Sequence, residues 1–279
     1  MPDRIALLLD LSYQTYRAAA AHKGLTCGET FTGGLYGFLG TTAKMIRETA
    51  ATHVWGMADS KPYKRSLIYP EYKQLRKKNA DPELLAAFNE STPLVLEALK
   101  VLGIPVVSVP GFESDDCVAS LVQAHHMRFK AMIAASNDSD LYQLLEYPHF
   151  QILRGSDRGS IVTRADLETG PMAMTPREFM LAQALQGTHN DVAGIPKVGP
   201  TTAYKIVKTP GLLRQAQERY GDLIQRNLML SELPHHEMPR LATPTMGTYN
   251  PRDLYRFCAR FDIEVTKSMV DSFEQLAHG

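Results

Sequence analysis

The sequence predicts an α/β fold, with a mainly parallel sheet and flanking helices in the first part of the chain and a helical region after it. Two observations support this prediction. Through about the first 170 residues, short apolar runs bounded by polar or turn residues alternate with amphipathic stretches, which is the order of β-α-β units. After about residue 170 the strand signals fade, and helical segments separated by Gly and Pro replace them. We therefore expect a core at residues 1–170 and a helical region at residues 171–279.

Four short segments are apolar enough to be buried strands, and two more form an expected hairpin. The four buried strands are expected at residues 4–11, 53–58, 104–109 and 131–135. The hairpin joins residues 150–154 to residues 160–163 through a turn that begins and ends with Gly. Parallel strands buried on both faces have this continuous apolar character.

The segments between and after these strands have helical spacing. In the core, helices are expected at residues 34–49, 82–102, 114–127 and 140–145. In the second region, they are expected at residues 176–186, 201–207, 212–220 and 222–230. Residues 234–251 are rich in Pro and Thr and are expected to form a loop.

Composition indicates an ordinary globular protein that resides in the cytoplasm. The chain of 279 residues is 44% hydrophobic, and its 30 Lys and Arg balance its 30 Asp and Glu. Asp10 interrupts the apolar stretch at residues 5–11, which is too short to span a bilayer, and no secretion leader begins the chain. The three cysteines are scattered without metal-ligand spacing, which is typical of a reducing compartment. We expect no contact with a membrane.

Seven carboxylates follow the ends of the four buried strands. They are Asp10, Asp59, Glu113, Asp115, Asp116, Asp138 and Asp140. The carboxyl ends of parallel strands meet at one edge of a sheet, so these side chains are expected to converge. Like charges this close need cations, and hard oxygen ligands favour Mg²⁺ or Mn²⁺. Two ions about 3.5–4 Å apart would suit hydrolysis of a phosphodiester. The alternative is that single Asp residues among them only cap helices and turns.

A basic stretch with interleaved tyrosines follows Asp59. Between residues 60 and 79 the single acid Glu71 stands among seven cations and three tyrosines: Lys61, Lys64, Arg65, Lys73, Arg76, Lys77, Lys78, Tyr63, Tyr69 and Tyr72. Cations attract phosphates, and aromatic faces stack on unpaired bases. Such a run can also be a solvated surface, but its position after Asp59 would place it over the expected metal site.

A Gly-containing turn between two expected helices is suited to holding a nucleic-acid backbone. Residues 194–203 contain Gly194 and Gly199, which allow close approach, and Thr201 lies at the start of the following helix. Lys197 and Lys205 add positive charge nearby. This pattern is typical of a helix–hairpin–helix element, which binds duplex backbone without reading the base sequence.

Together these segments resemble the 5′-nuclease superfamily (flap endonucleases and 5′–3′ exonucleases), particularly its bacterial and phage members. The matching stretches, in the order of the family, are Leu9-Asp10-Leu11-Ser12-Tyr13, Tyr36-Gly37-Phe38, Pro70-Glu71-Tyr72-Lys73, Glu113-Ser114-Asp115-Asp116, Ser136-Asn137-Asp138-Ser139-Asp140 and the Gly-containing turn. They cover residues from about 5 to 235.

The resemblance implies a PIN-like nuclease core with a helical arch at about residues 60–92, through which a 5′ single strand passes. It also implies a helix–three-turn–helix element for duplex DNA, often with a K⁺ or Na⁺ ion on hairpin carbonyls. By the resemblance, the acids from Asp10 to Asp116 hold one divalent ion, and Asp138 and Asp140 contribute to the second. Arg17 matches an arginine near the scissile phosphate. Tyr72, Lys73 and Arg76 match arch residues, and Lys73 is expected to polarise the phosphate.

One departure from the family affects the second metal site. The family has a Gly-Asp-x-x-Asp-Asn stretch before the hairpin, whereas this chain has Gly187-Thr188-His189-Asn190-Asp191-Val192. Asp191 is retained, but Thr188 replaces an acid. We expect weaker binding of the second ion, unless His189 or Asn190 compensates through water.

The sequence therefore predicts a metal-dependent 5′–3′ exonuclease and 5′-flap endonuclease of DNA replication or repair, acting as a monomer. Branched or 5′-flap DNA is the expected partner, and RNA–DNA junctions are an expected second substrate. Two alternatives remain: a PIN-type endoribonuclease, and a non-catalytic protein that binds DNA junctions. The net charge of zero is expected to be a sum of segregated charges, with acids in the metal pocket and cations on the arch and hairpin.

Overall fold

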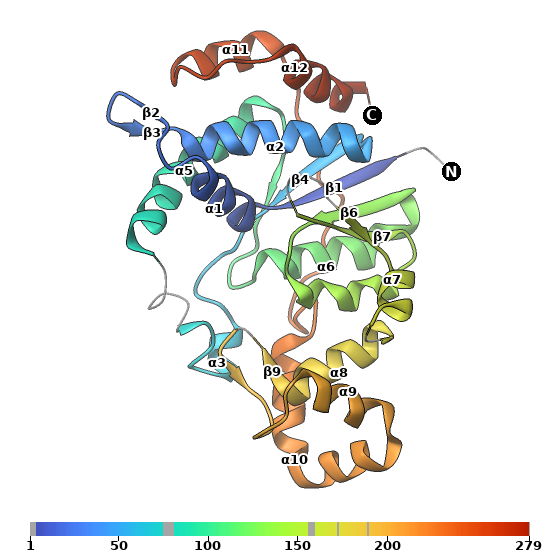
Figure 1. Cartoon of the computed structure of the whole chain (residues 1–279). Coiled ribbons are helices and arrows are strands. Elements are labelled where there is room, and N and C mark those ends of the chain that lie inside the picture. Colours follow the sequence, from blue (N-terminus) through green and yellow to red (C-terminus); the bar gives the residue numbers. More distant parts are fainter. Residues whose placement is uncertain (1–3, 75–80, 156–159, 172, 189, 279) are drawn as a thin grey trace.

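The structure is a computed structural model that describes residues 4–74, 81–155, 160–171, 173–188 and 190–278. Figure 1 shows a sheet at the centre of the molecule, helices on both of its faces, and a helical end formed by α8, α9 and α10. This arrangement confirms the predicted α/β class with a C-terminal helical region.

The central sheet has six strands in the order β5-β4-β1-β6-β7-β8. These strands are β5 (Val106–Val107), β4 (His53–Met57), β1 (Ile5–Asp10), β6 (Ala131–Ala135), β7 (Phe150–Arg154) and β8 (Ser160–Val162). Neighbouring strands are parallel except β8, which pairs antiparallel with β7 as the predicted hairpin. The expected strand at residues 104–109 is shortened to two residues.

The alternation of side chains along the strands divides the core into two layers. Leu7 and Leu9 of β1 face a cluster with α2 (Gly33–Thr49) and α5 (Pro82–Val101), against which α1 (Leu11–Ala21) packs. Ala6 and Leu8 face the opposite cluster with α6 (Ser114–His125) and the 3-10 helix η2 (Ser139–Glu146). Trp55 lies fully buried in this second layer. Because successive residues of a strand point to opposite faces, one apolar run supplies both layers.

A third cluster holds the helical end together. It packs α8 (Pro176–Gln186), α9 (Pro200–Lys208) and α10 (Pro210–Ser231), with the short strands β9 (Gly187–Thr188) and β10 (Val192–Ala193) beside them. The two helices expected at residues 212–230 form one long helix with a kink at Tyr220, whose φ of −132° is not helical. The sequence signal for two helices therefore corresponds to a kink within α10.

The last part of the chain returns to the sheet and its flanking helices. Residues 232–250 run along α6 without regular structure, as predicted, and Ser120 binds both the Pro239 carbonyl and the Leu241 amide. The chain then forms α11 (Pro251–Ala259), α12 (Lys267–Glu274) and the 3-10 helix η3 (Gln275–His278). Leu254, Phe257 and Phe273 complete the layer over α2 and α5. The sequence analysis did not predict these helices.

Several short elements complete the described fold. They are β2 (Thr26–Cys27), β3 (Thr30–Phe31), α3 (Arg65–Ile68), the 3-10 helix η1 (His126–Arg128) and α7 (Arg164–Thr169). Within the described residues, none of the helices has the length and apolar character that crossing a membrane requires.

Candidate active site

The acids that follow β1 and β4 lie at the carboxyl edge of the sheet, as the sequence predicts. Asp10 ends β1 and caps α1, and its Oδ1 accepts a hydrogen bond from the Tyr13 amide at 3.1 Å. Asp59 follows β4 and accepts hydrogen bonds from the Ser114 amide at 2.9 Å and the Ser12 hydroxyl at 3.0 Å. The capping interpretation is therefore correct for Asp10, yet both acids line a shared cleft.

The start of α6 divides its three acids between two environments. Glu113 is the N-cap, and its amide donates to Asp116 Oδ2 at 3.1 Å in a capping box. Asp116 is fully buried and points away from the cleft. Asp115 lines the cleft, and its Oδ1 is buried without a hydrogen-bond partner among the described residues. Adjacent helical residues point about 100° apart, which accounts for the different surroundings of the two carboxylates.

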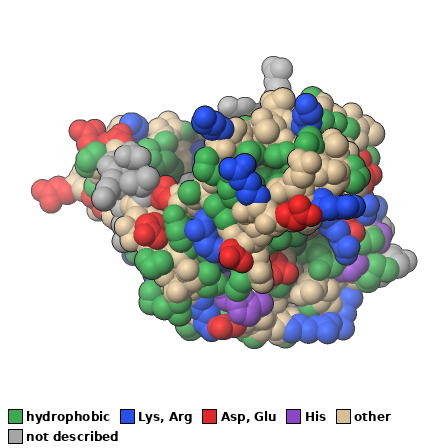
Figure 2. Space-filling model, turned by 90° about the horizontal axis from the view of Figure 1, so that it is seen from below, with side chains coloured by type: hydrophobic (Ala, Val, Ile, Leu, Met, Phe, Trp, Pro, Cys, Tyr) green, Lys and Arg blue, Asp and Glu red, His purple; other side chains and the backbone are tan. Residues whose placement is uncertain are grey.

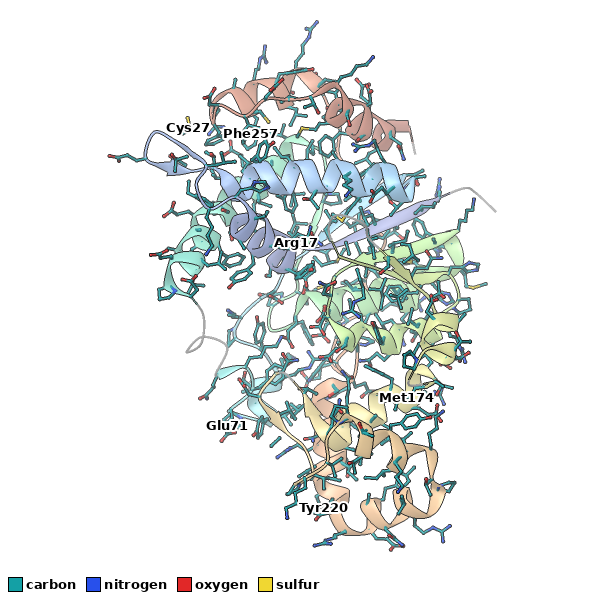
Figure 3. All side chains as sticks on the ribbon, in the orientation of Figure 1. Arg17, Cys27, Glu71, Met174, Tyr220 and Phe257 are labelled. Atoms are coloured by element: carbon teal, nitrogen blue, oxygen red, sulfur yellow. The ribbon has the colours of Figure 1, made fainter. Side chains whose placement is uncertain are left out.

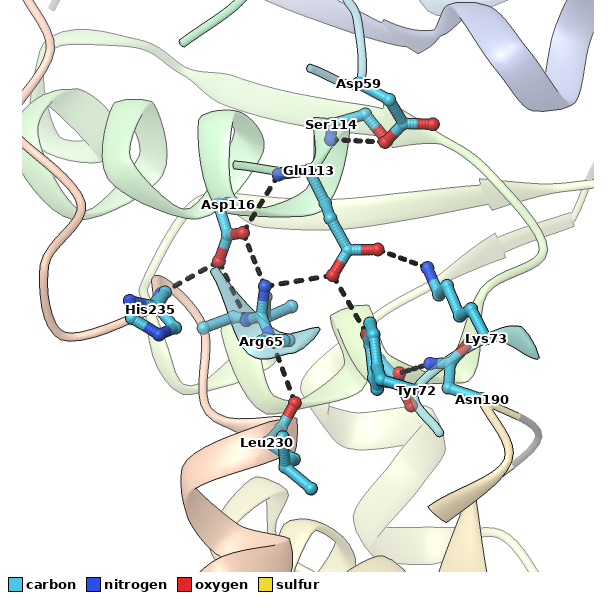
Figure 4. A network of polar contacts seen from close by, with 12 residues as sticks. Asp59, Arg65, Tyr72, Lys73, Glu113, Ser114, Asp116, Asn190, Leu230 and His235 are labelled. Carbon is cyan, nitrogen blue, oxygen red and sulfur yellow. Dashed lines mark hydrogen bonds and ion pairs between the residues drawn. The ribbon is translucent and has the colours of Figure 1, made fainter. Parts of the chain in front are cut away.

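Arg65 occupies the centre of a buried ionic network (Figure 4). Its guanidinium binds both oxygens of Asp116, at 2.6 and 2.9 Å, and Glu113 Oε2 at 3.0 Å. Burial opposes the charge of Arg65, but Asp116 and Glu113 outweigh it and raise the pKa of the guanidinium. With 3% exposure Arg65 cannot reach a DNA phosphate, which corrects its expected role as a DNA contact.

The expected role of Asp116 as a metal ligand is also corrected. Arg65, the Glu113 amide and the His235 amide at 2.8 Å occupy both of its carboxylate oxygens and leave none for a metal ion.

Tyr72 and Lys73 converge on Glu113 from the other side (Figure 4). The Tyr72 hydroxyl donates to Glu113 Oε2 at 2.9 Å, and Lys73 Nζ donates to Oε1 of the same carboxylate. Burial, and then the charge of Glu113, raise the pKa of the Tyr72 hydroxyl above its usual value. Lys73 adopts a left-handed backbone with φ of +56°, and its amide binds the Asn190 carbonyl at 3.1 Å. Lys73 is thereby held over the acids.

Asp138 and Asp140 follow β6, as predicted. Asp138 caps η2 by accepting from the Asp140 amide at 2.9 Å, and it lines the cleft. Asp140 is buried, and its carboxylate accepts from Gln183 Nε2 at 2.9 Å and from Asn190 Nδ2 at 3.1 Å. Gln183 is a site residue that the sequence analysis missed, because nothing in a helix of ordinary composition marks one Gln as facing an acid.

The turn between β9 and β10 carries the departure from the family pattern. Thr188 Oγ1 accepts a hydrogen bond from the Asn190 amide at 3.2 Å, so its hydroxyl supports the turn. Compensation by Asn190 through water was the alternative to a weaker second site, and the side chain of Asn190 donates directly to Asp140. Asp191 has a φ of +63° and lines the cleft. His189 lies outside the described residues.

The shared cleft has a volume of about 1630 Å³. This exceeds the roughly 300–1,000 Å³ of small-molecule pockets and suits a polymer. The acids that line it are Asp10, Asp59, Asp115, Asp138 and Asp191. The lining also contains two lysines and five aromatic residues: Lys61, Lys73, Tyr13, Tyr16, Tyr63, Tyr72 and Phe88. Arg17 lies on α1 (Figure 3), with its guanidinium carbon 5.7 Å from the centre of the ring of Tyr13, which lines the cleft.

The raised pKa values of two acids in the cleft indicate that these acids would bind a cation. Burial, and then the charges of Asp59 and Asp138, raise the pKa of Asp10 to about 7. Burial, and then the charges of Asp138 and Asp10, raise the pKa of Asp115 well above its usual value. Carboxylates that repel one another in this way are stabilised by a divalent ion with oxygen ligands. Within the part of the chain that is described, no three acid, His or Cys side chains are already arranged around a single point as a complete ligand set.

The pKa of Asp10 predicts that metal-free protein loses stability as the pH rises. The carboxyl titrates at 3.8 in the unfolded chain and at about 7 in the folded one, so the folded state holds a proton that the unfolded state has lost. This stabilisation is complete below about pH 4 and is lost above about pH 7. Asp10→Asn removes the charge but can still cap α1. In EDTA at about pH 8 we therefore expect this variant to unfold at a higher temperature than wild type. The rise in Tm should be about 2–4 °C for each kcal/mol of repulsion that is removed. Thermal unfolding at several pH values measures this effect, and a mutant whose Tm follows the wild-type pH profile would contradict it.

The other cations that were expected to contact DNA differ in their surroundings. Lys61 is exposed at the cleft, whereas Lys64 forms an ion pair with Glu237 beyond it. Arg76, Lys77 and Lys78 lie outside the described residues, as does part of the arch expected at residues 60–92. Figure 2, which looks onto the helical end, shows Lys and Arg side chains spread over this face with acidic side chains among them. The expected segregation of charge is therefore incomplete on this face.

The hairpin residues lie together at the start of α9. Gly194 is required by packing, because a Cβ there would lie 2.1 Å from the Gln186 carbonyl carbon. Gly199 is the N-cap of α9 and has no side-chain cap, so the first amides of the helix are open. Lys197, Thr201 and Lys205 are exposed around this end. The arrangement provides an anion-binding helix terminus.

Comparison with known proteins agrees with this geometry. The family model described as "5′-3′ exonuclease, N-terminal resolvase-like domain" matches residues 5–170. The 5′-3′ exonuclease of Aquifex aeolicus is 33% identical over 208 residues, which are 73% of this chain and 69% of the relative. DNA polymerase I of Mycobacterium tuberculosis is 32% identical over 237 residues, which are 80% of this chain. The alignment spans only 25% of that polymerase.

Solved structures share the fold. A phage T5 5′-exonuclease with bound zinc ions aligns with a TM-score of 0.69 at 17% identity, over 99% of each chain. Flap endonuclease-1 of Methanococcus jannaschii aligns with a TM-score of 0.64 at 15% identity, over 98% of this chain and 93% of the other. With the family model over more than half of its length, and acids at four strand ends around one cleft, the chain belongs to the 5′–3′ exonuclease family.

Proposed function

We propose that this protein is a divalent-metal-dependent 5′ nuclease that cleaves phosphodiesters at 5′ ends and 5′ flaps of DNA. The observation that carries the proposal is the cleft itself: acids from separate strand ends line it together with Lys61, Lys73 and aromatic side chains. An acidic lining alone would repel a polyanion. Because cations bound by the acids would reverse that charge, the cleft suits a nucleic-acid strand held against metal ions.

We assign the candidate ligands to two groups. Asp10, Asp59, Glu113 and Asp115 would hold one divalent ion, Mg²⁺ or Mn²⁺. Asp138, Asp140 and Asp191 would contribute to the second. Ions bound there would supply an activated water and stabilise the leaving oxygen.

The second ion would bind with lower affinity than the first. Gln183 and Asn190 donate hydrogen bonds to the two carboxylate oxygens of Asp140 and would compete with the ion for them.

The other side chains would orient the strand and balance its charge. The ammonium group of Lys73 donates a hydrogen bond to Glu113. A phosphate bound at the acids would therefore lie next to this ammonium group. Arg17 would add a second cation from α1. The ring of Tyr63 lines the same cleft and would stack on unpaired bases. Tyr72 is buried, and its hydroxyl is directed at Glu113.

The helical end would hold the duplex next to the cleavage site. Open amides at the start of α9, with Lys197 and Lys205, suit backbone phosphates and carry no base readout. A K⁺ ion on the hairpin carbonyls would strengthen this contact. We infer that the protein acts as a cytoplasmic monomer and that RNA–DNA junctions are a second substrate.

A substrate panel tests the proposal against its alternatives. The wild-type protein is incubated with a 5′-flap DNA duplex, the same duplex without a flap, single-stranded RNA and an RNA–DNA junction, over a Mg²⁺ and Mn²⁺ titration. We expect metal-dependent cleavage, fastest at the flap, that EDTA abolishes. Binding of the flap without cleavage at any metal concentration would favour the non-catalytic junction-binding protein. Faster cleavage of single-stranded RNA would favour the endoribonuclease.

A further inference from the structure

One buried side chain, Arg65, contacts both the helical end and the acids at the start of α6. Arg65 donates five hydrogen bonds, which equals the number of N–H groups in a guanidinium. Three of them reach the carboxylates of Glu113 and Asp116 at the start of α6. The other two reach main-chain carbonyls at the end of α10: Nε binds Leu230 at 2.9 Å and Nη2 binds Glu232 at 2.8 Å.

The end of α10 is bound to the core by further contacts around Arg65. We call residues 230–235 the α10 junction. The His235 amide donates to Asp116 Oδ1 at 2.8 Å (Figure 4). Gln143 of η2 donates to the Ser231 carbonyl at 2.8 Å and accepts from the Leu233 amide at 2.9 Å. The α10 junction therefore depends on the same Asp116 that fixes Arg65.

The charges in this network balance only if Arg65 and Lys73 are both present. Two carboxylates, Glu113 and Asp116, meet two cations in a region almost closed to water. The last carbonyls of a helix lack partners within it and carry partial negative charge. Arg65 satisfies two carbonyls at the end of α10 while it neutralises Asp116. Loss of its guanidinium would therefore leave a buried carboxylate without its cation and these two carbonyls without this donor.

We propose that Arg65 is a positioning residue that holds Glu113 in place for the metal site and fixes the helical end against the nuclease core. Binding of a duplex at α9 and α10 is thereby coupled to the geometry of the cleft acids. Lys cannot replace Arg65, because an ammonium group has three donors and no planar fork. The catalytic half of this proposal rests on the proposed nuclease function, whereas the structural half rests on the described contacts alone.

The first test compares Arg65→Lys with Arg47→Lys. Arg47 is a matched control, because it also joins two elements, with its Nη1 on Ser272 of α12 at 3.1 Å, but lies away from the acids. The Kd for Mn²⁺ is measured by EPR in the absence of DNA, and we expect Arg65→Lys to raise it about tenfold. We expect kcat on a 5′-flap duplex at saturating metal to fall about 100-fold, with KM within about threefold. Unchanged Mn²⁺ affinity and kcat would overturn the proposal, as would a loss confined to KM, which would indicate direct contact with DNA.

The second test needs no enzymatic activity and applies even if Arg65→Lys fails to fold. Hydrogen exchange is measured in Asp116→Asn and in Asp115→Asn, which changes the neighbouring acid outside the network. We expect exchange in the α10 junction to accelerate about tenfold in Asp116→Asn only, because the His235 amide and Arg65 lose a charged acceptor there. Equal exchange in the two variants would overturn the proposal. If exchange accelerates in Asp116→Asn but the wild-type protein cleaves no DNA, the result would instead count against the proposed function and leave the junction established.

Discussion

Replacement of Asp115 by Asn is expected to reduce cleavage of a 5′-flap duplex by about 10³-fold or more, as loss of a central group in an electrostatic site does. Asp115 lines the cleft, and its Oδ1 is buried without a partner among the described residues. Asn has nearly the same shape but lacks the charge that a divalent ion requires. Single-turnover rates over a Mg²⁺ titration measure the loss.

Stability separates this effect from misfolding. Burial and the charges of Asp138 and Asp10 raise the pKa of Asp115, so its ionised form destabilises the metal-free fold. In EDTA at neutral pH, Asp115→Asn is therefore expected to unfold at the same or a higher temperature than wild type, while losing most of the rise in Tm on addition of Mn²⁺. Asp271→Asn, an exposed change on α12, is the charge-matched control and should behave as wild type. Cleavage by Asp115→Asn at the wild-type rate would remove Asp115 from the metal site.

Replacement of Lys73 by Ala is expected to slow cleavage about 100-fold while changing the Kd for flap DNA less than about threefold. Lys73 is directed at Glu113 by its left-handed backbone and by the bond from its amide to Asn190. Its ammonium group would therefore act on the phosphate being cleaved more than on the bound strand as a whole. Glu113 keeps Arg65 and Tyr72 as partners in the variant, so the fold should survive.

The measurement for Lys73 is a comparison of two constants in one protein. Binding is followed by fluorescence anisotropy with Ca²⁺ in place of Mg²⁺, and the cleavage rate is followed separately at saturating Mg²⁺. Lys100→Ala removes the same charge from the exposed end of α5 and serves as the control. A loss of affinity with an unchanged rate would show that Lys73 only attracts the strand.

The strands and most helices were predictable because their signals are local. The strand at Ala131–Ala135 and the helix at Pro176–Gln186 begin and end at the predicted residues. Each is bounded by residues that cap, turn or interrupt it. The helices α11 and α12, which have nine and eight residues, were missed. They pack on α5 and α2, and packing between elements so far apart in the chain leaves no local pattern.

The correction at Arg65 has the same physical origin. In the sequence, Arg65 is one of seven cations in a basic stretch, and its neighbour Lys64 is only partly buried. The tertiary fold places Arg65 beside Asp116, 51 residues later, and beside Leu230, 165 residues later. Contacts over such separations depend on how helices pack, so a charged residue that is buried and one that is solvated have the same sequence signal.

The sequence by itself determined that acids gather at one edge of a parallel sheet, because strand direction and the alternation of strands and helices follow from local apolar patterns. It also determined the family, because the motifs occur in a fixed order. Only the tertiary structure decided which acids face the cleft. Asp115 and Asp116 are identical neighbours in the chain, but the turn of α6 directs one into the cleft and the other to Arg65. That choice is made by the packing of α3, α6 and α10 against one another, which is a property of the folded molecule alone.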